Sequence, residues 1–150
     1  MKPDQKSELV AEFCQSIFEL RYKLRRMFQV KLKEAGISIS FEVLEVIKIL
    51  DTHDGINQQE IADLLFKDKS SMTYLIDNMV KAGWATRRED ESDRRNKLIH
   101  LTAQAREMRL KLVPLARHCY LALSEEVTSD QVKAGIQTLA QMNHSVAEFI

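Results

Sequence analysis

Apolar side chains recur along most of this chain at the spacing of an α-helix. Over residues 8–34 they stand three or four residues apart, which predicts a stripe along one side of a long helix that Gly36 ends. The same period, with a capping residue at the start of most segments, predicts further helices over residues 40–52, 57–66, 68–82, from 102 onward and 128–150.

The pattern changes between residues 84 and 101. Short extended runs at 84–89 and 97–101 flank a charged loop at 90–96, which predicts a β-hairpin. Helix, short helix, turn, helix and hairpin, in this order, make up a winged helix-turn-helix. The predicted fold is therefore mainly α with a small β-hairpin wing (α+β). It is one domain over residues 1–150, in which a winged region at 37–101 is flanked by N- and C-terminal dimerisation helices at 1–36 and 102–150.

The apolar stripes at the two ends of the chain are not needed to complete the small winged core. Long helices with such stripes usually pack against another long helix. The stripes therefore indicate a homodimer, with packing inside one chain as the alternative. Two-fold symmetry in turn predicts a pseudo-palindromic DNA operator with half-sites about one helical turn apart.

Composition narrows the class of protein. Lys and Arg together number 22, as do Asp and Glu, so the net charge is zero and binding by total charge is disfavoured, although a local basic surface is not. With only four Gly and two Pro, helix is favoured over an all-β fold. No apolar run has the length of a membrane span, and the N-terminus lacks the apolar core of a signal peptide. The expectation is a soluble, cytoplasmic protein without a membrane partner.

Catalytic chemistry has no visible basis in the sequence. The four His are scattered, there is no Cys-x-x-Cys, and no Gly-rich phosphate loop is present. We therefore expect no catalytic residue, no metal site and no cofactor, and the chain is predicted not to be an enzyme.

Two segments carry candidate DNA-binding chemistry. The helix at 68–82 presents small hydroxyl and polar side chains that suit contacts with phosphates or base edges in the major groove, although Ser70 and Ser71 are equally typical of an ordinary first helical turn. In the hairpin, cations outnumber acids, and an exposed Arg at the tip can enter a narrow minor groove. We expect Asp93 to pair with a neighbouring Arg and to fix the tip.

The ordered motifs of this region resemble the MarR family of bacterial transcriptional regulators. They are Gly55-Ile-Asn-Gln-Gln-Glu-Ile-Ala-Asp-Leu-Leu65, Asp68-Lys-Ser-Ser-Met-Thr73, Met79-Val-Lys-Ala-Gly-Trp84, Arg87-Arg88, Asp93-Arg94-Arg95 and Leu101-Thr102. The resemblance implies an obligate homodimer with interlocked first and last helices. It also implies that Arg95 reads the minor groove and that Ser70, Ser71, Thr73 and Tyr74 face the major groove. Position 74 is often Arg in the family, so Tyr74 departs from the pattern.

The predicted DNA-binding residues come from the helix pair and the wing. They are Gln58, Lys69, Ser70, Ser71, Thr73, Tyr74, Asp77, Arg87, Arg94, Arg95 and Lys97, with Asp93 supporting the wing. The predicted function is a sequence-specific double-stranded DNA-binding regulator, in the family's commoner mode a repressor. A winged helix used only for protein–protein contact is the alternative.

The resemblance also implies a means of regulation. Family members commonly release DNA when a small phenolic or aromatic molecule binds, and a subclass instead senses organic hydroperoxides through a cysteine in the first helix. Cys14 lies in that helix, but Phe18 stands where the subclass has Tyr, so a structural role is favoured over a redox sensor. The basic stretch at residues 21–26 indicates a solvated helix face or, as the alternative, an anionic effector pocket or contacts with flanking phosphates. Cys119 falls on an apolar stripe and is interpreted as a small core residue.

Overall fold

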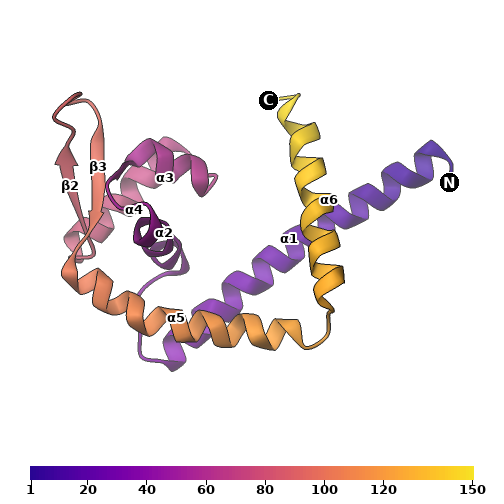
Figure 1. Cartoon of the computed structure of the whole chain (residues 1–150), viewed down its shortest axis with the longest axis horizontal. Coiled ribbons are helices and arrows are strands. Elements are labelled where there is room, and N and C mark those ends of the chain that lie inside the picture. Colours follow the sequence, from indigo (N-terminus) through magenta and orange to yellow (C-terminus); the bar gives the residue numbers. More distant parts are fainter. The chain divides into compact units, whose positions relative to one another are not determined.

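The computed structural model describes residues 1–150, and its elements follow the predicted order with one additional strand (Figure 1). This confirms the predicted fold class. The first helix begins earlier than predicted, because its apolar stripe starts only after about two turns. The elements are α1 (Pro3–Glu34), α2 (Phe41–Thr52), β1 (Ile56–Asn57), α3 (Gln58–Leu64), α4 (Lys69–Lys81), β2 (Ala85–Glu89), β3 (Lys97–Leu101), α5 (Ala103–Ser124) and α6 (Ser129–Ala147).

Polar side chains cap the helices where the sequence predicts it. Ser40 Oγ accepts a hydrogen bond from the Val43 N–H at 3.2 Å, and Asn57 Oδ1 accepts one from the Glu60 N–H at 2.8 Å. Thr128 caps α6 through the Gln131 N–H at 3.2 Å. These bonds satisfy N–H groups of the first turn that have no partner within the helix, and they fix where each helix begins.

The three strands form an antiparallel sheet in the order β1-β3-β2. The predicted hairpin pairs from Ala85↔Leu101 at its base to Glu89↔Lys97 near its tip. The two-residue strand β1, which the sequence analysis did not predict, pairs Ile56 with Ile99 on the other side of β3. Because β1 runs directly into α3, the start of the helix-turn-helix is hydrogen-bonded to the wing.

The chain divides into two compact units, Met1–Leu115 and Ala116–Ile150. In the first, the core lies between the helices of the winged region and the sheet, and Phe28 of α1 packs on Phe41 of α2 with ring centroids 5.7 Å apart. The largest fully buried side chains of this core come from all of these elements: they are Leu32, Val46, Ile47, Leu50, Ile61, Met72, Ile76, Met79 and Ile99.

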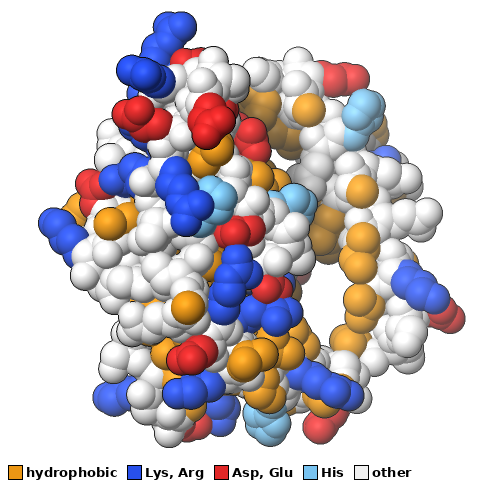
Figure 2. All heavy atoms as spheres, turned by 60° about the vertical axis from the view of Figure 1, so that its left-hand side comes forward, with side chains coloured by type: hydrophobic (Ala, Val, Ile, Leu, Met, Phe, Trp, Pro, Cys, Tyr) orange, Lys and Arg blue, Asp and Glu red, His pale blue; other side chains and the backbone are white.

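The second unit contains the last part of α5 and α6. Cys119 is buried, as expected, but α6 has no buried residue at all. Ile136 and Val146 of this helix are 62% and 53% exposed. Figure 2 shows hydrophobic side chains aligned along α6. The boundary between the units lies inside α5 next to Pro114, through which the helix continues. The domain limits at 36/37 and 101/102 stay predictions.

No helix in the structure combines the length and the apolar character needed to cross a lipid bilayer.

The turn between α3 and α4 contains a backbone conformation that glycine normally adopts. Phe66 has φ +54°, and it is 92% exposed. The Phe66 N–H bonds to the Asp63 carbonyl and the Lys67 N–H to the Ala62 carbonyl, the pattern of a Schellman motif. Gly36 and Gly83 take the equivalent left-handed position after α1 and α4. Phe66 therefore carries steric strain that its exposed ring does not offset by burial.

We expect Phe66→Gly to raise the free energy of unfolding by about 0.5–1 kcal/mol. Relief of the left-handed strain is worth roughly 1–2 kcal/mol, and the greater freedom of glycine in the unfolded chain removes roughly half of it. The midpoint of urea unfolding measures the change. Phe66→Ala, which retains a Cβ, is the control and should show no such gain; equal midpoints for the two variants would contradict this explanation.

Candidate nucleic-acid interface

Helix α4 is held at its start by Asp68 and along one side by the core. The Asp68 carboxylate accepts hydrogen bonds from the Ser71 N–H and the Ser71 hydroxyl, both at 2.8 Å, and these bonds lower the pKa of Asp68. Met72, Ile76 and Met79 are completely buried. The opposite face, with Lys69, Ser70, Ser71 and Tyr74, is therefore turned to solvent.

Four predicted DNA-binding residues form hydrogen bonds with one another. Arg87 Nη2 of β2 donates to Asp77 Oδ1 of α4 at 2.6 Å and to Gln58 Oε1 at 3.3 Å. Gln58 Nε2 in turn donates to Thr73 Oγ1 at 2.9 Å. We name Gln58, Thr73, Asp77 and Arg87 the brace, because they tie α3, α4 and the wing together. Arg87 Nε is buried without a hydrogen-bond partner.

The wing tip places Arg95 in solvent. Its side chain is 95% exposed, while Asp93 Oδ1 accepts a hydrogen bond from the Arg95 N–H at 3.1 Å and lies 3.5 Å from Nε. The Asn96 N–H also bonds to the Asp93 carbonyl at 3.0 Å, which closes the turn. Asp93 thus orders the backbone beneath Arg95 and leaves most of the guanidinium free.

The remaining wing cations differ in their surroundings. Arg94 is exposed and has no side-chain partner. Lys97 Nζ donates to Glu89 Oε1 of the paired strand at 3.0 Å, so much of its charge is compensated. At the base of the tip, hydrogen bonds from the hydroxyl and the N–H of Ser92 lower the pKa of Asp90. Figure 2 shows both acidic and basic side chains at the tip of the wing.

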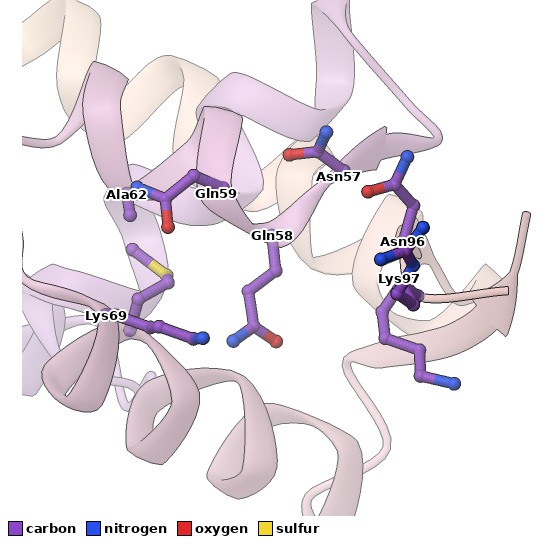
Figure 3. Close-up of a pocket in the computed structure, with 9 residues that line it drawn as sticks. Asn57, Gln58, Gln59, Ala62, Lys69, Asn96 and Lys97 are labelled. Carbon is purple, nitrogen blue, oxygen red and sulfur yellow. The ribbon is translucent and has the colours of Figure 1, made fainter. Parts of the chain in front are cut away.

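A depression of about 230 Å³ joins the wing to the helix-turn-helix. Figure 3 shows Gln58 and Lys69 on one side of it and Asn96 and Lys97 on the other. Its lining residues are Asn57, Gln58, Gln59, Ala62, Lys69, Met72, Arg95, Asn96 and Lys97. The tip of the wing and the start of α4 therefore border one continuous polar surface with three cations, Lys69, Arg95 and Lys97.

Sequence reasoning missed one exposed polar residue on α4. Asn78 follows Tyr74 by one helical turn, and its side chain is exposed without a partner. Its position four residues after Tyr74, on a helix whose other face is apolar, is the signal that identifies it.

A second depression, of about 430 Å³, lies on α1 in the predicted basic stretch. It is lined by Tyr22, Arg25, Arg26, Gln29, Val30 and Lys33. Arg25 pairs with Glu42 of α2, and Lys23 Nζ lies 2.5 Å from Glu19 Oε1. Part of the positive charge of the stretch is thus compensated within the chain. Cys14, further toward the N-terminus of α1, is a half-buried free thiol.

Taken together, the hairpin, the helix pair and their bordering cations define a winged helix-turn-helix protein. Residues 40–97 match the family model of the MarR family, and this part of the chain is similar to that family. This confirms the predicted resemblance.

Named relatives agree with this class. The HTH-type transcriptional regulator YfiV of Bacillus subtilis (strain 168) is 27% identical over 100 residues, 67% of this chain and 62% of YfiV. The organic hydroperoxide resistance transcriptional regulator of the same organism is 22% identical over 91% of this chain and 92% of its own length. The chain thus spans less than two thirds of YfiV. Both relatives are regulators by name, in agreement with the prediction of a non-enzyme.

A solved structure shows the same fold. The crystal structure of a mutant MarR from E. coli complexed with operator DNA has a TM-score of 0.80 at 20% identity, covering 89% of this chain and 94% of that one. The likeness extends beyond the winged region to most of the chain.

Proposed function

We propose that this protein is a sequence-specific double-stranded DNA-binding transcriptional regulator, in its simplest mode a repressor. The observation that carries the proposal is the surface on which the exposed guanidinium of Arg95 and the free face of α4 border one depression. A helix for the major groove and an Arg-bearing tip for the minor groove are the two parts that a winged helix-turn-helix uses on a duplex. The protein would act in the cytoplasm, where it meets its operator.

We further propose that two copies act together as a homodimer. Within α1, Leu9 and Leu20 are 53% exposed, and α6 buries none of its apolar residues. Exposed apolar stripes on long helices mark surfaces that a partner covers. The same stripes of a second copy of the chain would cover these surfaces. Two-fold symmetry would then direct the two wings at a pseudo-palindromic operator. Sedimentation should give twice the chain mass of 17.4 kDa.

An effector would act by favouring a conformer whose half-site spacing no longer fits the operator. The depression on α1 combines the ring of Tyr22 with Arg26 and Lys33, which suits a small aromatic molecule carrying a carboxylate or phenolate. A tenfold loss of operator affinity needs a coupling of only about 1.4 kcal/mol. Screening phenolic compounds for release of bound DNA tests this part of the proposal.

Selection of genomic fragments that the protein retards in a gel tests DNA binding itself. The region upstream of its own gene is the first candidate. We expect specific retardation of a few fragments in the presence of excess competitor DNA. Absence of retardation at low salt would reject the proposal and favour a winged helix that binds only other proteins.

We expect operator affinity to fall steeply with salt concentration. Each phosphate neutralised by Lys or Arg releases counterions, so a dimer that contacts four or more phosphates should give a log–log slope of about −4 or steeper. Fluorescence anisotropy of a labelled fragment, titrated at several salt concentrations, measures the slope. A flat plot would mean that the basic surface does not contact the phosphate backbone.

A second function, peroxide sensing by Cys14, is favoured by one specific observation. One relative is an organic hydroperoxide resistance regulator by name, and Cys14 is a free thiol that is only partly buried. If Cys14 is the sensor, an organic hydroperoxide should release DNA from the wild-type protein but not from Cys14→Ser. Equal behaviour of the two proteins would leave Cys14 with a structural role.

A further inference from the structure

We propose that base-specific contacts of α4 come from the row Ser70, Tyr74 and Asn78, and that this row selects A·T base pairs. The inference rests on the proposed function, because it names which residues of that interface read the sequence of the DNA. We call these three residues the reading row.

The reading row contains the uncharged polar side chains of α4 that are left free by the rest of the chain. Its members stand four residues apart, so they lie on one face over about 12 Å of helix. All three are exposed, Tyr74 to 72%, and none of their side chains has a hydrogen-bond partner in the chain. They can meet base edges without giving up an existing interaction.

The hydroxyl and acidic side chains of α4 outside the row are already engaged. The Ser71 hydroxyl donates to Asp68, and the Thr73 hydroxyl donates to the Lys69 carbonyl at 2.9 Å while it accepts from Gln58. A hydroxyl has a single proton to donate, so neither can donate to a base without breaking its present bond. Asp77 is held by Arg87 in the brace. These residues therefore position α4 and donate no hydrogen bond to a base.

The chemistry of the reading row favours adenine and thymine. An Asn side chain forms two hydrogen bonds with adenine, at N6 and N7, and an apolar ring surface contacts the methyl group of thymine. Arg, the commonest partner of guanine, is absent from the row, and the nearest Arg of the sheet, Arg87, is bound in the brace. Tyr74 and Asn78 thus have partners in A·T pairs, and Ser70 is compatible with either pair.

Base analogues in the operator that lack a single methyl group or a single ring nitrogen test this assignment. In a fragment that the wild-type protein binds, each thymine is replaced in turn by uracil, which lacks only the methyl group, and each adenine by 7-deazaadenine, which lacks only N7. We expect at least one uracil position in each half-site to weaken wild-type binding about fourfold, the effect of one methyl group. Uracil at that position should leave the operator affinity of Tyr74→Ala unchanged, whereas it should weaken binding by Tyr74→Phe as much as binding by the wild type.

The matching adenine experiment uses Asn78→Ala, which should lose its response to one 7-deazaadenine. Thr52→Ala serves as the control, because this hydroxyl lies at the end of α2 and donates to the Ile49 carbonyl of the same helix, and it should keep the whole wild-type response. Binding to non-specific DNA should be similar for all variants, which shows that they are folded. A uracil position that weakens wild type and Tyr74→Ala equally would overturn the assignment, as would full operator affinity in Tyr74→Ala. If wild type binds no fragment, the proposed function itself fails.

Discussion

Replacement of Arg95 by alanine is expected to weaken operator binding by about 1–3 kcal/mol while the protein stays dimeric. Arg95 is 95% exposed, and Asp93 orders the turn beneath it, so the side chain reaches outward without supporting the fold. An Arg in a narrow A·T-rich minor groove gains from the enhanced negative potential there. Anisotropy titrations of the operator fragment measure the affinity, and sedimentation checks the dimer.

Arg88→Ala is the matched control for this experiment. Arg88 is an exposed cation of the same hairpin, but it lies on β2, outside the loop that forms the tip. Its loss should weaken specific and non-specific binding to a similar, smaller extent, because it changes only the general attraction to phosphates. Equal effects of the two substitutions on the operator would show that Arg95 contributes charge alone and does not enter the groove.

Removal of the Asp54 carboxylate is expected to lower the free energy of unfolding by about 2–3 kcal/mol. Asp54 follows α2, and its Oδ1 accepts a hydrogen bond from the Leu101 N–H at 2.9 Å. Its Oδ2 lies 2.8 Å from Arg106 Nη2 of α5. Asp54→Ala would leave the N–H of β3 without a partner and would break a charge-assisted bond, each of which costs about 1–3 kcal/mol.

Urea unfolding at a fixed protein concentration measures this loss, because the stability of a dimer depends on concentration. Asp54→Asn, which retains an oxygen acceptor for the Leu101 N–H, should lose less than Asp54→Ala. An unchanged midpoint with an unchanged slope in Asp54→Ala would show that the carboxylate does not hold the wing to the helices.

The helices were predictable from sequence because their signals are local. Ser40, Asn57, Asp68 and Thr128 lie within three residues of the N–H groups that they cap, and Gly36 follows directly on the helix that it ends. A pattern read along the chain contains both partners of such an interaction. The α4 face and the Arg-bearing hairpin tip were identified for the same reason.

The interactions that the sequence did not reveal join distant residues. Strand β1 has only two residues, and its partner Ile99 lies far along the chain from Ile56. Arg87 donates a hydrogen bond to Gln58, which is 29 residues away in the sequence, and Arg106 donates one to Asp54, which is 52 residues away. A residue type indicates that a side chain can form an ion pair but not which partner it meets. The brace was therefore identified only from the structure. Its hydrogen bonds show which side chains position α4, and the side chains without such bonds are free to contact DNA.

Phe66 shows a different limit. An apolar residue at the end of a helical pattern is typical of a core position, and the predicted third helix extended to it. In the structure the helix ends at Leu64, and Phe66 stands exposed in a left-handed turn. Hydrophobicity alone does not distinguish a core residue from one in the C′ position of a Schellman motif, where backbone geometry decides.

The mass of the protein–operator complex tests the central claim most directly. The claim is that two copies of this chain together place α4 and the wing on one duplex. Native mass spectrometry of the protein with a selected fragment should show two chains on each duplex at low salt, and the Arg95→Ala protein should lose most of this species at the same concentration. A complex with a single chain, or a wild-type protein that forms no complex with any selected fragment, would contradict the account.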